Sequence, residues 1–245
     1  MTSQHPLRIL VPMKPAYEGK TRLAGVLDAD GRAALSLHLL QHVLSVASRV
    51  ASAETWVIGG DAWVKHVATL ESALWQPDAG GGLNEALRPA IRVAFEAGAP
   101  AILVLPGDLG LLTPGDVNDL VRLANGFQKA VVSRAAADGG TNALLVPRGL
   151  ALGPFFGPGS FQRHMQEAQK AKVPVEICHA AGLAFDLDTP HDLLAYRAAR
   201  PELESALTSW REKLRSQTPE LTGYWKGESR GAKPRWRGSG GAPQI

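Results

Sequence analysis

A run of five apolar residues at positions 101–105, Ala-Ile-Leu-Val-Leu, constrains the fold of this chain more than any other segment. A strand that is apolar at every position is typical of the middle of a parallel sheet, where helices cover both faces. Helical segments separate most of the further strand-like runs, which occupy residues 7–11, 56–59, 130–133, 143–146 and 173–178. This alternation predicts an α/β fold in a single domain, with a mostly parallel sheet flanked by helices.

Residues that favour helix starts mark the segments between these strands. We expect Asp30 to cap a long helix that ends near residue 50, and Asn84 to cap one that ends near residue 97. Thr113 and Pro114 open the next helix, because Thr favours the cap and Pro the first turn. Further helices are predicted at residues 160–171, 189–200 and from 201 onward.

Composition narrows the class of protein. The chain has 245 residues, of which 45% are hydrophobic, and this is enough to bury one full-sized core. Cys178 is the single cysteine, so an intramolecular disulfide is excluded and a reducing cytoplasm is expected. No apolar run approaches the roughly 20 residues that span a bilayer, and we expect no export signal and no membrane partner.

Charge is distributed unevenly along the chain. Residues 211–245 carry eight Lys or Arg and three Glu, a formal charge of +5, while the whole chain carries +3, so residues 1–210 carry −2. We therefore predict a folded domain at residues 1–210 and a basic, flexible C-terminal tail at residues 211–245. The tail contains Trp225 and Trp236 among its basic residues.

Aspartates follow two of the apolar runs, and each time a Thr-Pro-x-Asp helix start comes next. Asp108 follows the run at 101–105, and Asp186 and Asp188 lie two residues apart, on one face of an extended backbone. Taken singly, Asp108 could be a helix-entry acid and Asp188 a turn acid beside the Thr189 cap. As a set at strand ends, the three carboxylates favour a Mg²⁺ site shared with substrate phosphates.

Three cations follow the first strand. Lys14, Lys20 and Arg22 stand in a loop that prolines stiffen, at a strand end where ligands of parallel sheets bind. They could meet the negative charges of a triphosphate, although a solvated surface loop is an equal alternative. The loop lacks the Gly-x4-Gly-Lys-Ser/Thr spacing of a P-loop.

Glycine-rich segments add further candidates. Gly81, Gly82 and Asn84 stand where a backbone without side chains could lie against a base or ribose. Asp-Gly-Gly-Thr-Asn at 138–142 contains Thr141, and Phe-Gly-Pro-Gly-Ser at 156–160 contains Gly157 and Ser160 at a helix start that could hold an anion. The alternatives are a flexible loop, a hairpin turn and a plain helix cap.

Histidine and cysteine offer weaker signals. His38 and His42 have the i, i+4 spacing of some zinc ligands, but no third ligand accompanies them, and their helix is interpreted as a packing element. His164 is expected at the surface, and Cys178 in the core.

Several of these segments, taken in order, resemble the CofC family, the guanylyltransferases of coenzyme F-420 biosynthesis. The resemblance covers about residues 7–200 and implies a nucleotidyltransferase fold, Rossmann-like and glycosyltransferase-A-like, related to molybdopterin-guanylyl and sugar-nucleotide enzymes. The segments that carry it are Lys-x5-Lys-Thr-Arg-Leu from Lys14, Gly-Gly-Leu-Asn from Gly81, Leu-Pro-Gly-Asp-Leu to Leu109, residues 138–142, residues 156–160 and Asp-Leu-Asp-Thr-Pro from Asp186.

The resemblance implies transfer of GMP from GTP to 2-phospho-L-lactate, phosphoenolpyruvate or 3-phospho-D-glycerate, with release of pyrophosphate. A downstream transferase would then attach the product to a deazaflavin precursor. The implied roles are Mg²⁺ ligation by Asp108, Asp186 and Asp188, catalysis by Asp108 with the three cations, triphosphate binding by Lys14, Lys20 and Arg22, guanosine contact by Gly81, Gly82 and Asn84, and acceptor binding by Thr141, Gly157 and Ser160.

Two departures and two alternatives stay open. Family members usually have Pro two residues after the middle-strand aspartate, where this chain has Gly110, and the tail lies outside the family pattern. One alternative is a related enzyme with a molybdopterin or sugar-phosphate acceptor, which the absence of a Gly-rich loop after the first strand disfavours. The other is a non-catalytic nucleotide- or RNA-binding module that uses the basic tail. The oligomeric state is open, a homodimer being one alternative.

Overall fold

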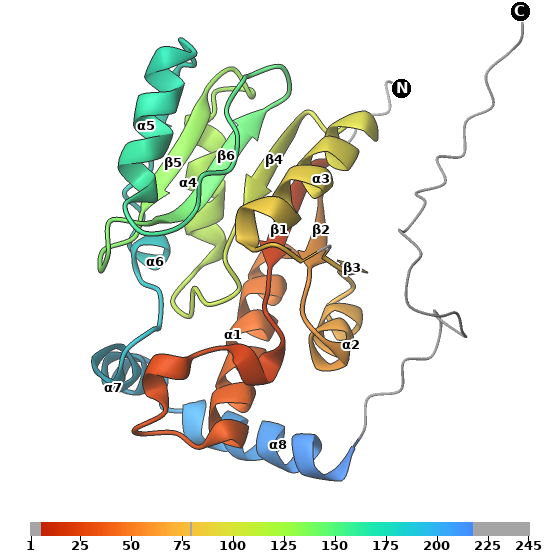
Figure 1. Ribbon diagram of the computed structural model, residues 1–245, viewed down its shortest axis with the longest axis vertical. Coiled ribbons are helices and arrows are strands. Elements are labelled where there is room, and N and C mark those ends of the chain that lie inside the picture. Colours follow the sequence, from red (N-terminus) through yellow and green to blue (C-terminus); the bar gives the residue numbers. More distant parts are fainter. Residues whose placement is uncertain (1–5, 79, 218–245) are drawn as a thin grey trace, which may run out of the picture.

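The computed structural model, which describes residues 6–78 and 80–217, is built on one seven-stranded sheet (Figure 1). The strand order is β3-β2-β1-β4-β6-β5-β7. Only β6 runs antiparallel to its neighbours β4 and β5, and the other pairs are parallel. The predicted mostly parallel sheet is therefore confirmed, with strands at Leu7–Pro12 (β1), Ala53–Ile58 (β2), Leu74–Gln76 (β3), Ala101–Val104 (β4), Ala130–Arg134 (β5), Thr141–Pro147 (β6) and Val175–Ile177 (β7).

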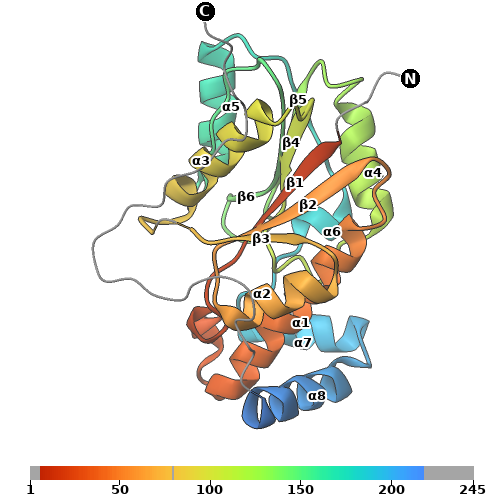
Figure 2. The same ribbon diagram turned by 90° about the vertical axis from the view of Figure 1, so that its right-hand side faces the viewer.

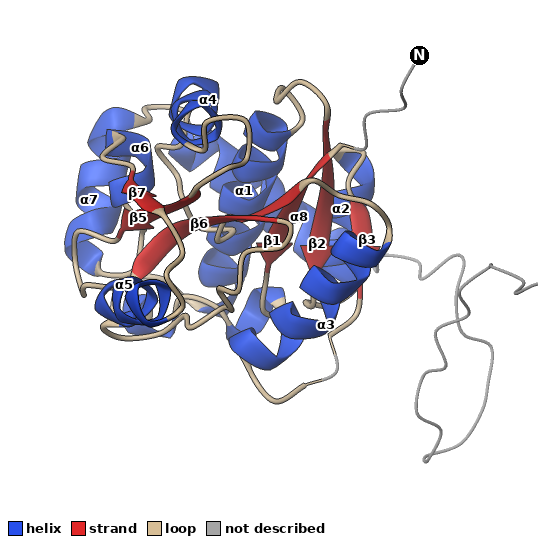
Figure 3. Ribbon diagram, turned by 90° about the horizontal axis from the view of Figure 1, so that it is seen from above, coloured by secondary structure: helices blue, strands red, loops and turns tan. Residues whose placement is uncertain are grey.

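Helices cover both faces of the sheet, as Figure 3 shows from above. α3 and α5 lie on one face, and the larger core on the other face receives residues from α1, α2, α4, α6, α7 and α8. Two short 3-10 helices, η1 (Ala16–Glu18) and η2 (Thr21–Leu23), follow β1. The helices are Ala29–Ala47 (α1), Ala62–Leu70 (α2), Leu83–Glu96 (α3), Pro114–Leu123 (α4), Ser160–Lys170 (α5), Ala181–Ala184 (α6), Pro190–Ala199 (α7) and Leu203–Ser216 (α8).

The continuous apolar strands are explained by burial on both faces. In β1, Ile9 packs into the larger core while Leu10 packs under α3 and α5. In β4, Leu103 and Ile102 divide between the same two cores. Because successive side chains of a strand point to opposite faces, both sets of positions must be apolar when helices cover both sides.

Two predicted helix caps are wrong. Asp28, not Asp30, caps α1, and its carboxylate accepts a hydrogen bond from the Gly31 N–H at 2.7 Å. Gly82, not Asn84, stands at the cap of α3, and Asn84 is the second residue of the helix. The sequence also failed to indicate α2 and β3, which have nine and three residues, because short elements carry little periodicity.

The final helix continues past the predicted start of the tail. α8 lies along α1 (Figure 2) and buries Leu203, Leu207 and Trp210 against it. Its Arg211 and Arg215 form ion pairs with Asp28 and Asp30 of α1, both at 2.8 Å. Residues 211–216 thus belong to the folded body. Trp225 and Trp236 of the predicted tail lie outside the described residues, and no helix within the described part is long and apolar enough to cross a membrane.

Candidate active site

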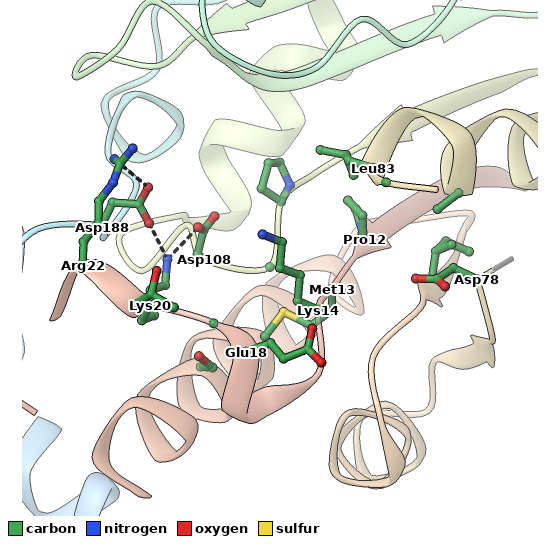
Figure 4. Close-up of a pocket in the computed structure, with 18 residues that line it drawn as sticks. Pro12, Met13, Lys14, Glu18, Lys20, Arg22, Asp78, Leu83, Asp108 and Asp188 are labelled. Atoms are coloured by element: carbon green, nitrogen blue, oxygen red, sulfur yellow. Dashed lines mark hydrogen bonds and ion pairs between the residues drawn. The ribbon is translucent and has the colours of Figure 1, made fainter. Parts of the chain in front are cut away.

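A cavity of about 500 Å³ opens where β1, β2 and β4 end (Figure 4). The loop after β1 forms one wall, and the turn after β4 and the start of α3 form others. All three segments follow the carboxyl ends of parallel strands, which is where open α/β sheets bind ligands. The lining residues are Pro12, Met13, Lys14, Glu18, Gly19, Lys20, Thr21, Arg22, Ser36, Ile58, Asp78, Gly82, Leu83, Ala86, Pro106, Gly107, Asp108 and Asp188.

Lys20 joins two of the predicted carboxylates at one end of this cavity. Its Nζ donates to Asp108 Oδ2 at 2.7 Å and to Asp188 Oδ1 at 3.0 Å. The Lys20 side chain is only 7% exposed, and its backbone has a φ of 54° in the left-handed region. Burial lowers the pKa of Lys20, but the charges and hydrogen bonds of both aspartates outweigh that effect and raise the pKa overall. Lys20 is therefore a permanent cation here.

The other predicted cations lie on either side of this cluster. Arg22 is mostly exposed, and its guanidinium lies 3.7 Å from Asp188 Oδ2. Lys14 lines the middle of the cavity between the Asp108 and Asp78 ends (Figure 4), and the described residues offer it no ion pair. The structure thus brings all three cations of the predicted loop to one cavity.

The third aspartate stands apart from the other two. Asp186 Oδ1 accepts a hydrogen bond from Asn142 Nδ2 at 3.2 Å. Burial raises the pKa of Asp186, the Asn142 hydrogen bond opposes this, and the charges of Asp108 and Asp188 raise the pKa further. Among the described residues, no three His, Cys, Asp or Glu side chains are grouped so that they could hold one metal ion. The predicted trio is therefore not gathered here, and only Asp108 and Asp188 converge.

Backbone contacts fix the turn that carries Asp108. The Gly110 N–H donates to the Asp108 carbonyl at 3.0 Å, a bond that proline could not make. A Cβ at position 110 would lie only 2.6 Å from the Tyr196 ring, which stacks on Phe185 just before Asp186. The packing of Tyr196 therefore favours glycine at position 110, and the hydrogen bond to Asp108 disfavours proline there.

Capping boxes fix the helices that follow both aspartate turns. Thr113 with Asp116 caps α4, and Thr189 with Asp192 caps α7. The Asp192 carboxylate also accepts from the Asp188 N–H at 3.1 Å. Both predicted Thr-Pro-x-Asp helix starts are confirmed, and the second one directly holds the backbone of a site residue.

The predicted nucleoside segment divides between two roles. Gly81 and Gly82 have φ values of 89° and 108°, where side chains are strained, and they open α3 with no side-chain cap. Asn84 instead contacts protein: its amide donates to the Phe156 carbonyl at 3.0 Å and accepts from the Phe156 N–H at 2.8 Å. In this structure Asn84 fastens the loop before α5 to the start of α3.

Two of the predicted acceptor residues belong to a buried hydrogen-bond network around His164. The Phe155 N–H donates to His164 Nε2 at 3.0 Å, so the ring proton must sit on Nδ1, which donates to Thr141 Oγ1 at 3.0 Å. The Ser160 hydroxyl lies 3.0 Å from the same oxygen. Gly157 is exposed at a φ of 130°. The expectation that His164 lies at the surface is wrong, because its ring is 0% exposed.

Acid should loosen this network. Burial lowers the pKa of His164 to about 4, and nearby Arg163 lowers it while the Ser160 backbone opposes both effects. Unfolding would restore a pKa near 6.5, so the unfolded chain binds more protons between pH 6.5 and 4 and stability falls as pH falls through that window. We expect a loss of about 2–3 kcal/mol in the free energy of unfolding by pH 4.5, measured with urea. In a His164→Gln variant, the decrease in the free energy of unfolding on acidification should be smaller by this amount. An equal decrease in both proteins would contradict the assignment.

The remaining candidates are accounted for by packing. His38 Nε2 lies 3.3 Å from the Tyr196 hydroxyl, and His42 Nε2 lies 2.8 Å from the Leu112 carbonyl. Cys178 is buried, as expected. Sequence reasoning gave no role of its own to Asp78, which opens the Gly-rich segment and lies at the far end of the cavity. It missed Ser36 beneath Gly19, because Ser36 lies within a helix interpreted as packing.

Known proteins are similar to this chain in sequence, and others are similar to it in fold. Residues 7–197 match the family described as "Guanylyl transferase CofC like". A phosphoenolpyruvate guanylyltransferase of Rubrobacter xylanophilus is 42% identical over 190 residues, covering 78% of this chain and 93% of the relative.

Solved structures share the architecture at low identity. A protein of Desulfovibrio desulfuricans G20, assigned as a nucleotide-diphospho-sugar transferase, has a TM-score of 0.65 at 19% identity over 85% of this chain and 95% of its own. A 4-diphosphocytidyl-2C-methyl-D-erythritol synthase has a TM-score of 0.56 at 17% identity over 79% and 98%. By its sequence, the chain belongs to the CofC-like guanylyltransferase family and is therefore a nucleotidyltransferase.

Proposed function

We propose that the protein transfers GMP from GTP to phosphoenolpyruvate and releases pyrophosphate, as a step of coenzyme F-420 biosynthesis. The observation that carries the proposal is the Lys20 ammonium between Asp108 and Asp188 at one end of a cavity of about 500 Å³. That cavity suits a ligand with a strongly anionic end. The choice of phosphoenolpyruvate among the three acids is supported by the name of the relative that is 42% identical.

The proposed chemistry needs no nucleophile from the protein. A phosphate oxygen of phosphoenolpyruvate attacks the α-phosphorus of GTP and forms a new P–O bond, while the bond between the α-phosphorus and the bridging oxygen breaks. The bonding electrons leave with pyrophosphate. Lys14, Lys20 and Arg22 bind the triphosphate and stabilise the charge on the leaving group, so positioning and electrostatics carry the reaction.

Asp108 and Asp188 fit Mg²⁺ by their donor chemistry. Both carboxylates remain partly exposed, at 29% and 40%, and they already converge on a cation in the form of Lys20. Mg²⁺ commonly takes one or two carboxylates together with substrate phosphates, so two suffice. When bound, the ion would neutralise charge on the reacting phosphates. Asp186, held by Asn142, adds negative charge nearby and remains the third proposed ligand.

The acceptor would lie against Thr141, Gly157 and Ser160. His164 donates to Thr141 Oγ1, and with the Ser160 hydroxyl donating to the same oxygen, the proton of the Thr141 hydroxyl is left to donate outward. Gly157 and the start of α5 add backbone N–H groups that favour a phosphate or carboxylate. Gly81 and Gly82 would lie against guanosine, with Asn84 holding the two substrate-binding loops together.

Purified protein supplied with GTP and Mg²⁺ provides the test. Pyrophosphate release should be fastest with phosphoenolpyruvate, slower with 2-phospho-L-lactate and 3-phospho-D-glycerate, and absent with molybdopterin or a sugar phosphate. EDTA should abolish the reaction. Release with a sugar phosphate alone would overturn the proposal, and nucleotide binding without any turnover would favour the non-catalytic alternative. Adding the downstream deazaflavin transferase should increase the yield by consuming the product.

A further inference from the structure

The cavity has a second acidic position, at the end opposite Lys20. Asp78 follows the edge strand β3, and Figure 4 places it across the cavity from Asp108 and Asp188, with Pro12 and Lys14 between. In the strand order, β3 and β4 are separated by β2 and β1, and three spacings of about 4.8 Å give roughly 14 Å. This span suits a whole nucleotide, base at one end and phosphates at the other.

Charge decides which end of a nucleotide Asp78 can meet. Lys20 and Arg22 lie at the Asp108 and Asp188 end and Lys14 lies in the middle of the cavity, so the triphosphate oxygens would extend from the middle toward that end. A carboxylate at the opposite end repels phosphate and, because it only accepts hydrogen bonds, requires a donor from its ligand. Among the described residues, Asp78 forms no ion pair and accepts a single hydrogen bond, from the Gly80 N–H to Oδ1 at 3.0 Å.

The surroundings hold this carboxylate in place and suit a flat ring. The end of β2 is tied to β3, because the Gly59 N–H donates to the Gln76 carbonyl at 2.8 Å and Trp75 Nε1 donates to the Gly59 carbonyl at 2.8 Å. A Cβ on Gly59 would lie 2.5 Å from Asp78 Oδ2, so only glycine leaves space for that oxygen. Apolar side chains of Pro12, Ile58, Leu83 and Ala86 line the cavity between.

We infer that Asp78 is the residue that reads the guanine base. The guanine edge offers two adjacent donors, N1–H and N2–H, which match the two oxygens of a carboxylate, whereas adenine offers an acceptor at N1. Asp78 therefore selects GTP over ATP. This inference rests on the proposed use of GTP, and it assigns base selection to one side chain that takes no part in the transfer itself.

Inosine triphosphate, which keeps N1–H but lacks the 2-amino group, tests the pairing. With wild-type protein we expect kcat/KM for GTP to exceed that for inosine triphosphate by about 10- to 100-fold, the effect of one hydrogen bond to a charged group. Asp78→Ala should lower kcat/KM for GTP by about 100-fold, chiefly through KM, and bring the two nucleotides within a few-fold of each other. Equilibrium binding of GTP and inosine triphosphate without acceptor should show the same convergence.

Deoxy-GTP and a surface variant supply the controls. The ratio of GTP to 2′-deoxy-GTP should stay unchanged in Asp78→Ala, and its collapse would instead make Asp78 a ribose contact and overturn the inference. Asp119→Asn, an exposed change on α4, should leave every ratio at the wild-type value. If a folded Asp78→Ala protein still prefers GTP to inosine triphosphate as strongly as wild type does, base reading by Asp78 is refuted and the proposed function stands. If wild-type protein uses no nucleotide at all, the proposed function is refuted as well.

Discussion

Replacing Lys20 with Met lowers the rate of pyrophosphate release by about a thousandfold or more. The Lys20 ammonium contacts both Asp108 and Asp188, at 2.7 and 3.0 Å. Removal of one preorganised donor from an oxyanion hole typically costs about 10²–10³ in turnover, and here two carboxylates also lose their shared counter-charge. Steady-state assay with saturating GTP and phosphoenolpyruvate measures the loss.

Lys129→Met is a matched control for the Lys20 variant. Lys129, just before β5, pairs with Glu176 of β7 at 2.6 Å; neither residue lines the cavity, and both side chains are substantially exposed. An exposed pair contributes at most about 1 kcal/mol, so turnover should stay within about twofold of wild type. Lys20→Met protein that keeps its fold, shown by circular dichroism, and also keeps a tenth of the wild-type rate would refute the assignment.

Asp188→Asn should reduce turnover by several powers of ten while leaving the fold intact. The substitution removes a charge that faces Lys20, Arg22 and the proposed Mg²⁺. The helix cap that follows does not depend on this side chain, because Thr189 and Asp192 form the capping box of α7. The concentration of Mg²⁺ that gives half-maximal rate should rise in any residual activity, and near-normal turnover would exclude Asp188 from the site.

The opposite pattern is expected for an aspartate that only caps a helix. Asp116 forms the equivalent capping box of α4 with Thr113, away from the cavity lining. Asp116→Asn should lower the free energy of unfolding by about 1 kcal/mol and leave turnover near wild type. Comparison of the two variants in urea unfolding and in the pyrophosphate assay separates chemistry from stability.

Local patterns in the sequence predicted the sheet and both aspartate turns well. The strands at residues 7–11 and 101–105 were detectable because burial on two faces favours apolar residues at successive positions, with Arg8, paired with Glu54, as the exception in β1. The Thr-Pro-x-Asp starts were detectable because capping is a contact within four residues. β3 was not predicted, because a strand of three residues is too short to show a hydrophobic period, and the role of Asp78 after this strand was therefore not predicted either.

Contacts between distant segments could not be predicted in the same way. The sequence around His164 does not indicate that its ring forms a hydrogen bond with Thr141. Likewise, the sequence around Asn84 does not indicate its hydrogen bonds with the backbone of Phe156. Gly110 packs against Tyr196, which lies 86 positions further along the chain. The basic segment at 211–216 is helical because Leu207 and Trp210 pack against apolar residues of α1.

Local sequence established the residue types of the site, namely three cations after β1, an aspartate after β4 and two aspartates before α7, but the expected strand end before Asp186 and Asp188 is instead the short helix α6. A parallel sheet brings the ends of β1 and β4 to one edge, whereas the position of Asp188 at the cavity depends on tertiary packing. That Lys20, rather than a third carboxylate, stands between Asp108 and Asp188 follows only from the tertiary structure. The same is true of the position of Asp78 across the cavity from them. Lys20 is separated from Asp108 by 88 positions and from Asp188 by 168 positions, so these contacts depend on packing of the whole domain, which no local pattern encodes.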